Sequence, residues 1–393
     1  MEVEGLHHED VTDGRMPGTS FITGLRNLTG STRPAVPAVS RAGSAASRRL
    51  SRRGLLVATG VAALAGGGAI GLWRESSAGL VSAPPDGKPL GGGRSASATH
   101  RATAGTQVRT LTNADRVLAV AYSPPQLGLI ASAGVDRTIR LWRSDTGAPV
   151  GNLTGHDSWV GSIAYSPNGA QLATASGDHT VRICDAGTGN LIHKLDHPDE
   201  VFSVAYAPNS AQLATACMDG TVRVWDAGTG TVLESLPGHK TGVCAVAYSP
   251  NSAELATASR DGQVFVWRAD TLAFLRALPG HNGPVALAYS PNSVQLATVG
   301  NDQTVRLWRA GTGTVIRSFT GHDDSIYSVS YAPDSTQFAT ASQDRTAKVW
   351  RADSGEGIRT LPHSSAVHCV AYSPDGSQLA IAVDDNTVRI WAT

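Results

Sequence analysis

A short phrase recurs seven times from residue 107 onwards in this 393-residue chain. It reads LATASGDHTVRIC at residues 172–184 and ATACMDGTVRVW at residues 214–225. The copies are spaced by 41 or 42 residues, and their final residues are Trp142, Cys184, Trp225, Trp267, Trp308, Trp350 and Trp391. Such a period over seven copies identifies a small structural unit that is stable only when it packs against copies of itself.

Each copy contains four short apolar runs with turn residues between them. In the second copy, VGSIAY (160–165) leads through Ser-Pro-Asn-Gly to QLATAS (171–176), and TVRIC (180–184) leads through a glycine-rich turn to NLIHKL (190–195). Runs of this length, in a chain with 43 glycines and 20 prolines, predict a four-stranded antiparallel sheet. One such sheet cannot bury both of its faces, and stacking the copies solves this.

The recurring Thr, Asp, His and Cys raise the question of nucleophilic catalysis, because these are its residue types. In the complete copies a His lies 21 or 22 residues before the Asp, a Ser or Thr lies four before it, and a Trp lies six after it. Repetition of this group argues for a structural role instead. With this period and spacing, residues 107–393 resemble the WD40 repeat family, whose copies have four strands each. The resemblance implies an all-β fold, a seven-bladed β-propeller.

WD40 blades often carry these four residue types as a buried hydrogen-bonded set, so the resemblance implies the same sets here. A buried Asp needs hydrogen bonds, and an imidazole can link it to a hydroxyl that also accepts the indole N–H. Complete sets are expected in four blades, formed by His197, Thr215, Asp219 and Trp225; His239, Thr257, Asp261 and Trp267; His281, Thr298, Asp302 and Trp308; and His322, Thr340, Asp344 and Trp350.

The other three blades are incomplete. Asn113 stands in place of the His in blade 1, Ile381 replaces the hydroxyl residue in blade 7, and Cys184 replaces the Trp in blade 2. We expect Cys184 to pack as a small apolar residue and not to act as a nucleophile. Blades 1, 2 and 7 are predicted to be the softer arc of the ring.

The two ends of the repeat region predict how the ring closes. QVRTL at 107–111 resembles the outermost strands of other copies, such as EGIRTL at 356–361, but no blade precedes it. The chain ends just after Trp391, with no outermost strand following. We therefore expect the N-terminal strand to complete the last blade.

The first 106 residues follow a different pattern. Residues 1–50 are rich in Gly, Ser, Pro and Arg and are expected to be disordered, whereas residues 74–106 are typical of a flexible linker. Residues 54–73 carry no charge, and as a helix they are long enough to span a membrane. Five arginines lie within residues 41–53, just before this stretch, and one follows it closely, which predicts a cytoplasmic N-terminus and an extracytoplasmic propeller.

Residues 51–73 also resemble a twin-arginine export signal, through Arg52 and Arg53. The sequence leaves an uncleaved membrane anchor and a cleaved signal open. In both cases the chain is similar to bacterial WD40 proteins that have an N-terminal signal or anchor segment. We expect it at the cell membrane or exported, and a cytoplasmic propeller is the remaining alternative.

Charge and cysteine usage narrow the function. Residues 1–106 contain 12 basic and 7 acidic residues (+5), whereas residues 107–393 contain 20 and 25 (−5). An acidic propeller argues against nucleic-acid binding. None of the four cysteines shows CxxC spacing, so neither a zinc site nor a redox pair is indicated, and no cofactor is expected.

Two classes of function remain. An enzyme that uses the central channel would need chemical groups that break the repeat, and the sequence contains no HExxH, phosphate loop or GxSxG. The other class is a scaffold or sensor module with a monomeric propeller that binds protein partners without catalysis, and this is our prediction. Aromatic and Arg side chains are the strongest interface anchors. Candidates at the first-strand entrances and before the Asp of each turn are Arg116, Trp159, Glu200, Phe202, Met218, Arg260, Asn301, Tyr327, Gln343 and His368.

Overall fold

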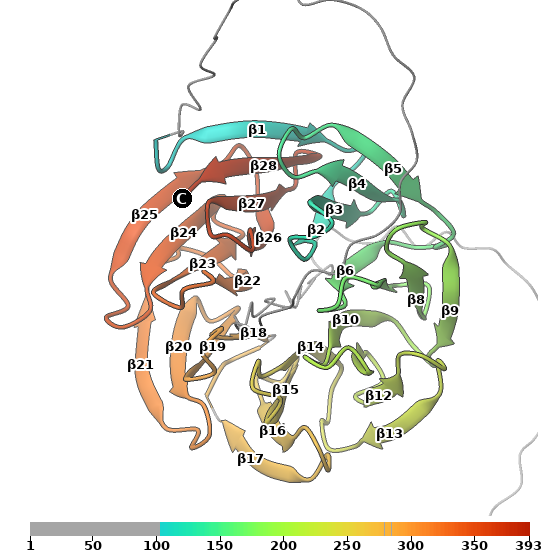
Figure 1. The fold of residues 1–393 in the computed structure, drawn as a ribbon. Helices are drawn as coiled ribbons and strands as arrows, with labels where there is room; N and C mark the ends of the chain where they lie inside the picture. The colour runs from blue at the N-terminus through green and yellow to red at the C-terminus, as the bar shows by residue number, and fades with distance from the viewer. Residues whose placement is uncertain (1–102, 279, 284) are drawn as a thin grey trace, which may run out of the picture. The chain divides into compact units, whose positions relative to one another are not determined.

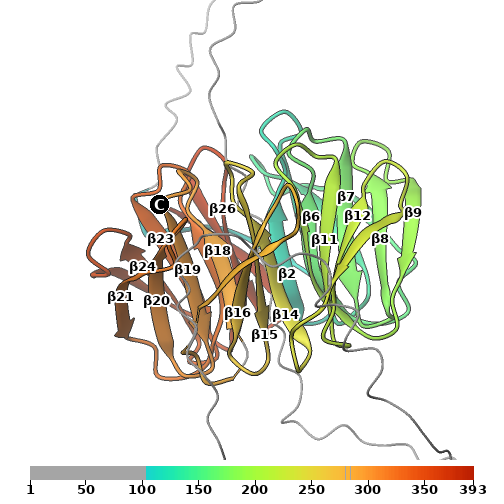
Figure 2. The same cartoon turned by 90° about the horizontal axis from the view of Figure 1, so that it is seen from below.

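The computed structural model describes residues 103–278, 280–283 and 285–393. These residues form seven antiparallel sheets of four strands each, arranged as a ring (Figure 1). In Figure 2 the ring is seen from its edge, and the strands run between its two faces. This is the all-β, seven-bladed propeller that the repeat predicts.

We number the blades along the chain and give each blade's strands from the axis outward. The strands of blades 1 to 7 are β2 (Val117–Tyr122), β3 (Leu129–Gly134), β4 (Ile139–Arg143) and β5 (Pro149–Leu153); β6 (Val160–Tyr165), β7 (Gln171–Ser176), β8 (Thr180–Asp185) and β9 (Leu191–Asp196); β10 (Val201–Tyr206), β11 (Gln212–Cys217), β12 (Val222–Asp226) and β13 (Val232–Leu236); β14 (Val243–Tyr248), β15 (Glu254–Ser259), β16 (Val264–Arg268) and β17 (Phe274–Leu278); β18 (Val285–Tyr289), β19 (Gln295–Gly300), β20 (Thr304–Arg309) and β21 (Val315–Thr320); β22 (Ile326–Tyr331), β23 (Gln337–Ser342), β24 (Thr346–Arg351) and β25 (Gly357–Pro362); and β26 (Val367–Tyr372), β27 (Gln378–Val383), β28 (Thr387–Ala392) and β1 (Gln107–Thr112).

The N-terminal strand β1 completes blade 7, next to the last strand of the chain (Figure 1). It pairs antiparallel with β28, with Leu111 opposite Val388. Two further backbone bonds extend this pairing: Gly105 donates to Ala392 at 2.7 Å, and Ala392 donates to Thr106 at 3.0 Å. The predicted closure of the ring by the N-terminal strand is confirmed.

The hydrophobic core lies between neighbouring blades. The innermost strands are buried along their length, whereas the outermost strands are mostly exposed. Between blades 3 and 4, Ala214 and Val224 pack in one cluster with Val246, Leu255 and Trp267. The small residues on one sheet leave room for the large indole of the next. Burying each such Val or Leu side chain contributes about 1.5–3 kcal/mol, which a blade obtains only through its neighbours.

The innermost strands share an irregularity near their first residue. In six blades the register with the second strand shifts there, as between Val201 and Ser203 in blade 3. A β-bulge of this kind re-aims the side chain of the extra residue. In blade 5 the described pairs, from Val285 to Tyr289, run without a shift, and this strand has five residues instead of six. The bulges thus place Phe202 and its counterparts at the face where the innermost strands begin.

The predicted disordered region (1–50), the predicted signal or anchor helix (51–73, with Arg52 and Arg53) and nearly all of the predicted linker (74–106) lie outside the described residues. Within the part of the chain that is described, no helix is long and apolar enough to cross a membrane.

Removal of β1 should destabilise the whole ring. Blade 7 would lose its outermost strand, and the core between blades 7 and 1 would lose Leu111. A chain that starts at Asn113 is expected to melt at a lower temperature than a control chain that starts at Thr103, as followed by circular dichroism. Equal melting temperatures would show that β1 does not close the ring.

Candidate functional site

The recurring polar residues form continuous hydrogen-bonded sets in blades 5 and 6. In blade 5, Nδ1 of His281 lies 3.0 Å from Oδ1 of Asp302, and Nε2 lies 2.7 Å from Oγ1 of Thr298. The indole N–H of Trp308 donates to the same oxygen at 2.8 Å. Blade 6 has the corresponding contacts, at 2.7, 2.7 and 2.8 Å, among His322, Asp344, Thr340 and Trp350. Each set joins the loop before the innermost strand to the turn after the second strand.

Blade 2 keeps most of this arrangement without an indole. His156 lies 2.7 Å from Oδ2 of Asp178 and 2.8 Å from Oγ1 of Thr174. Cys184 takes the position of the Trp and is buried, as expected. Burial raises the pKa of its thiol, so the nucleophilic thiolate is disfavoured at neutral pH.

The set of blade 3 lacks the expected link from His to Asp. Asp219 pairs with Arg223 at 2.7 Å, and Nδ1 of His197 contacts a backbone carbonyl oxygen at 3.1 Å instead. The contacts of His197 and Trp225 with the Thr215 hydroxyl remain, at 2.8 and 3.0 Å. The Arg223 guanidinium thus bonds to the carboxylate in place of the imidazole, whereas in blade 5 Asp302 contacts His281 at 3.0 Å and has its Arg306 at 3.5 Å.

The set of blade 4 also lacks this link, for a different reason. The phenyl ring of Phe265 stacks on His239, with ring centroids 4.3 Å apart. Nδ1 of His239 has no hydrogen-bond partner among the described residues, and Asp261 accepts a turn N–H instead. The Thr257 hydroxyl still contacts His239 at 2.8 Å and Trp267 at 3.1 Å.

The incomplete sets of blades 1 and 7 differ in what remains. In blade 1 the Ser132 hydroxyl donates to Oδ1 of Asn113 at 2.9 Å and accepts the indole N–H of its blade at 2.9 Å. In blade 7 Ile381 offers no hydroxyl. The two ring nitrogens of His363 and the indole N–H of Trp391 are buried without hydrogen-bond partners among the described residues.

The sets control charge in the interior. Burial by itself raises the pKa of the set carboxyls, but hydrogen bonds from the facing His and a nearby Thr outweigh it and lower the pKa well below the usual value in Asp178, Asp302 and Asp344. Where His has no such carboxylate, burial lowers its pKa to about 4, as in His197, His239 and His363. These imidazoles are neutral at pH 7.

Five of the predicted interface residues gather on blades 2 to 4, at the face where the innermost strands begin, which we call the entry face. The rings of Trp159 and Phe202 lie 5.2 Å apart. The Arg260 guanidinium lies 5.7 Å from the Phe202 ring centre and donates to Sδ of Met218 at 3.5 Å. The backbone carbonyl of Glu200 accepts the Met218 N–H at 2.8 Å. We call these five residues the aromatic arc.

Four more predicted residues form a second group, on blades 6, 7 and 1. The Tyr327 ring stacks on His368 at 5.5 Å, and its hydroxyl donates to Gln343 at 2.5 Å. Nε2 of His368 lies 3.1 Å from Asp384, whose carboxylate also pairs with Arg116 at 3.7 Å. We call these five residues the polar arc. In Figure 1 the blades of the two arcs lie on opposite sides of the ring axis.

Two residues of the entry face differ from the sequence-based prediction. Asn301, in the half-buried turn of blade 5, lies between the two arcs in blade order. Asp384 was missed, although it is central to the polar arc. The sequence could have indicated Asp384, because it lies just before the repeat Asp385, at the same turn position that Met218 and Arg260 occupy in their blades.

A series of bonds between blades was also missed. In blades 1, 3 and 6 the Tyr that ends the innermost strand donates to a Gln at the start of the preceding blade's second strand: Tyr122 to Gln378, Tyr206 to Gln171 and Tyr331 to Gln295, each at 3.1 Å. In blade 4, Glu254 takes the place of this Gln. It accepts the Tyr289 hydroxyl at 3.0 Å and pairs with Arg276. The signal was ELATAS at 254–259, where other copies begin with Gln.

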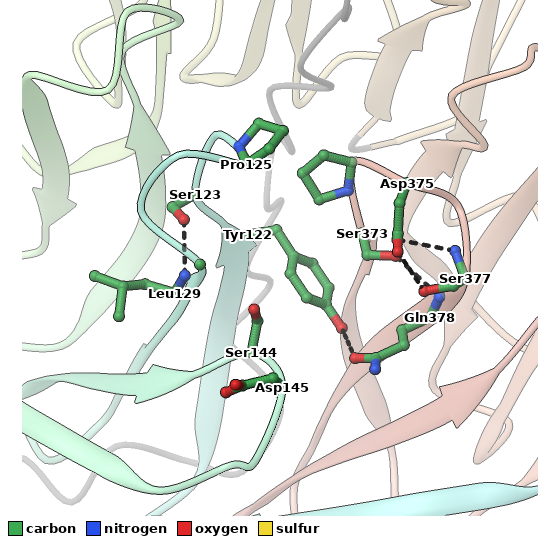
Figure 3. Close-up of a pocket in the computed structure, with 12 residues that line it drawn as sticks. Tyr122, Ser123, Pro125, Leu129, Ser144, Asp145, Ser373, Asp375, Ser377 and Gln378 are labelled. Atoms are coloured by element: carbon green, nitrogen blue, oxygen red, sulfur yellow. Dashed lines mark hydrogen bonds between the residues drawn. The ribbon is translucent and has the colours of Figure 1, made fainter. Parts of the chain in front are cut away.

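Pockets lie at the blade junctions on the opposite face. The pocket between blades 7 and 1 has a volume of about 420 Å³, and the Tyr122 hydroxyl points across it to Gln378 (Figure 3). A pocket of about 400 Å³ lies at the corresponding junction of blades 5 and 6, beside Gln295. Equivalent residues of the repeat line both pockets, such as Ser373 and Ser290, so the pockets follow from the spacing of neighbouring blades.

Among the described residues, no three His, Cys, Asp or Glu side chains are grouped so that they could hold a metal ion.

Comparison with known families agrees with this geometry. Seven segments match the WD domain, G-beta repeat, at residues 105–143, 147–185, 189–226, 230–268, 272–309, 313–351 and 355–392. They cover more than half of the chain. The chain belongs to the WD40 repeat family. Each WD40 segment starts with the outermost strand of one blade and ends with the third strand of the next, so the repeats interlock the blades.

The WD40 region is similar to parts of several eukaryotic proteins. It is 38% identical over 74 residues to nuclear distribution protein nudF 2 of Talaromyces marneffei, 39% over 69 residues to Coronin-7 of Mus musculus, and 43% over 88 residues to the ribosome biogenesis protein WDR12 homolog of Nematostella vectensis. These matches cover 19%, 18% and 21% of this chain, and 16%, 8% and 21% of the relatives. They give no support to the resemblance to bacterial proteins with an N-terminal signal or anchor.

Blade 5 has the contact between His and Asp and blade 4 lacks it, so one substitution in each blade tests what this contact contributes to stability. Asp302→Ala would leave Nδ1 of the buried His281 without its carboxylate, whereas Asp261→Ala removes a carboxylate that His239 does not contact. Both Asp residues accept a turn N–H, and Asp302 also accepts the Asn282 N–H and the Thr304 hydroxyl, so Asp302→Ala is expected to cost about 1–3 kcal/mol more. Urea denaturation at pH 7 measures this.

The pH dependence checks the same assignment. Because the folded-state pKa of Asp302 is lowered from 3.8, its contribution is complete above about pH 4 and is lost as the pH falls further. The difference between wild type and Asp302→Ala should therefore shrink below that pH. Equal destabilisation by the two substitutions at pH 7 would refute the role assigned to the His281 contact.

Proposed function

We propose that this WD40 propeller is a scaffold or sensor module that binds protein partners through its entry face and performs no catalysis itself. The observation that carries the proposal is the grouping of Trp159, Phe202 and Arg260 from three blades into one arc. Trp and Arg are among the residue types that dominate the binding energy of protein interfaces, and the buried Phe202 packs against both side chains. None of them belongs to the repeated sets that hold the blades together.

The alternative of an enzyme that uses the central channel is less well supported. The thiols of Cys217 and Cys244 are buried, and burial raises their pKa to about 11 and about 12. The repeat histidines are buried between blade loops and strands. Side chains in these states do not supply the thiolate or the accessible base that nucleophilic catalysis uses.

We further propose that the chain acts at the cell membrane or is exported, through residues 54–73. This rests on the uncharged stretch and on the arginines before it. A cytoplasmic signalling scaffold is the alternative. Protease treatment of intact cells with an N-terminal tag separates them: digestion of the propeller with a protected tag supports the proposal, and protection of both until lysis refutes it.

Truncation of entry-face aromatics should release the partner. Trp159→Ala tests the aromatic arc and Tyr327→Ala tests the polar arc. The variant in the arc that contacts the partner is expected to bind about 30-fold more weakly or worse, since a central aromatic anchor contributes about 2 kcal/mol or more. Quantitative cross-linking in the native cell measures this. Leu233→Ala, on the exposed outermost strand β13, is the control. Retention of the partner by both aromatic variants, with loss in the control, would move the interface to the outer rim.

A further inference from the structure

The side chain of Arg260 differs from the other arginines of the entry face. Its guanidinium rests on the Phe202 ring and donates to the thioether of Met218. A thioether is a weak acceptor, so this contact satisfies little of a group with five N–H donors. Arg260 is half-buried.

Most arginines near this face are already paired with a carboxylate. Each partner is on the same blade or the next, as in the ion pairs of Arg116, Arg140, Arg223, Arg306 and Arg389 with Asp384, Asp136, Asp219, Asp302 and Asp385. Across residues 103–278, 280–283 and 285–393, Arg260 has no such ion pair. The reason lies in the repeat: it occupies the turn before Asp261, and the strand position that usually carries the paired Arg is Phe265.

The surroundings hold this guanidinium in place beside an apolar surface. Trp159 packs over Gly177, where a Cβ atom would lie 2.4 Å from the indole. Met218 packs over Gly242, where a Cβ atom would lie 2.2 Å from Sδ. The two glycines let the indole and the thioether lie close to the backbone. Trp159 and Met218 are thereby held in place beside the Arg260 guanidinium before a partner binds, which reduces the ordering cost of binding.

The acidic neighbours of the aromatic arc restrict which anions can bind to the Arg260 guanidinium. The Glu200 backbone N–H is bonded to the Asp199 carboxylate at 2.8 Å. Burial and then Asp199 raise the pKa of Glu200, against the opposing effects of His179 and Arg260. A doubly charged phosphate would meet more repulsion from these two acids than a singly charged carboxylate would.

We propose that Arg260 binds the carboxylate of an Asp or Glu side chain in an extended peptide segment of the partner, with the neighbouring apolar side chain of that segment against the half-buried Trp159 and Met218, while the buried Phe202 supports the Trp159 ring and the guanidinium. The proposal rests on the proposed function and names the partner chemistry of its aromatic arc. A guanidinium prefers a carboxylate to any uncharged acceptor, and it forms two parallel hydrogen bonds with it.

Selection from a phage-displayed library of random linear peptides tests the proposal with the full chain as target. Wild type and the control Arg345→Met, an exposed arginine of the same face, should enrich peptides in which Asp or Glu adjoins an aromatic or aliphatic residue. Arg260→Met should lose this enrichment. Circular dichroism melting of each variant confirms that the fold is retained.

An enriched peptide then enters a double-mutant cycle, measured by fluorescence anisotropy. Replacing its acid by the amide, or using Arg260→Met, should each weaken binding by about tenfold or more, and the two together should cost little beyond either one. Glu200→Gln should strengthen binding by roughly twofold or more, because a repelling charge is removed. A damaged fold would weaken binding, so an increase in affinity cannot be explained by damage to the fold.

The outcomes separate the two proposals. If wild type enriches no peptide, the proposed function of the entry face fails, and this inference fails with it. If peptides are enriched without an acid, or bind equally well to Arg260→Met, only the inference is overturned. Tighter binding after replacement of the acid by phosphoserine would also overturn it, in favour of a phosphopeptide.

Discussion

Contact between neighbouring sheets is the constraint on which the rest of the structure depends. A four-stranded blade has two apolar faces, one covered by the preceding blade and the other by the following blade. Trp267 of blade 4, for example, packs in one cluster with Ala214 of blade 3. In an open row, the first and last blades would each leave one face exposed. The ring removes both exposed faces, and the β1–β28 pairing ties the last blade to the chain segment that leads into the first.

The polar sets depend on this packing and in turn hold the loops of the entry face. Their centre is the hydroxyl rather than the indole. Blade 2 loses the indole at Cys184 and still keeps the bonds of His156 to Asp178 and Thr174. Blade 7 loses the hydroxyl at Ile381, and there His363 has no hydrogen-bond partner among the described residues. The hydroxyl both donates and accepts, so its loss removes two links at once.

The two arcs of the entry face are built from positions where the copies differ. One turn position holds Met218, Arg260, Gln343 and Asp384 in different blades, and each contributes to an arc of the entry face. In the polar arc the charges of Arg116 and Asp384 satisfy each other. In the aromatic arc Arg260 is left to contact a ring and a thioether. The two sides of the same face therefore differ in their readiness to accept a charged partner group.

The number of blades, the strand order and the closing strand follow from the sequence, because turn residues and apolar periodicity are local and are repeated seven times. The sequence also located nine residues of the two arcs. The polar contacts, in contrast, are set by the packed arrangement of the blades. Asp219 and Asp302 share a repeat position, and each is followed four residues later by an Arg, yet Asp219 bonds to Arg223 whereas Asp302 faces His281. Competition among donors within hydrogen-bond reach depends on side-chain positions across a blade, and a linear pattern does not contain them.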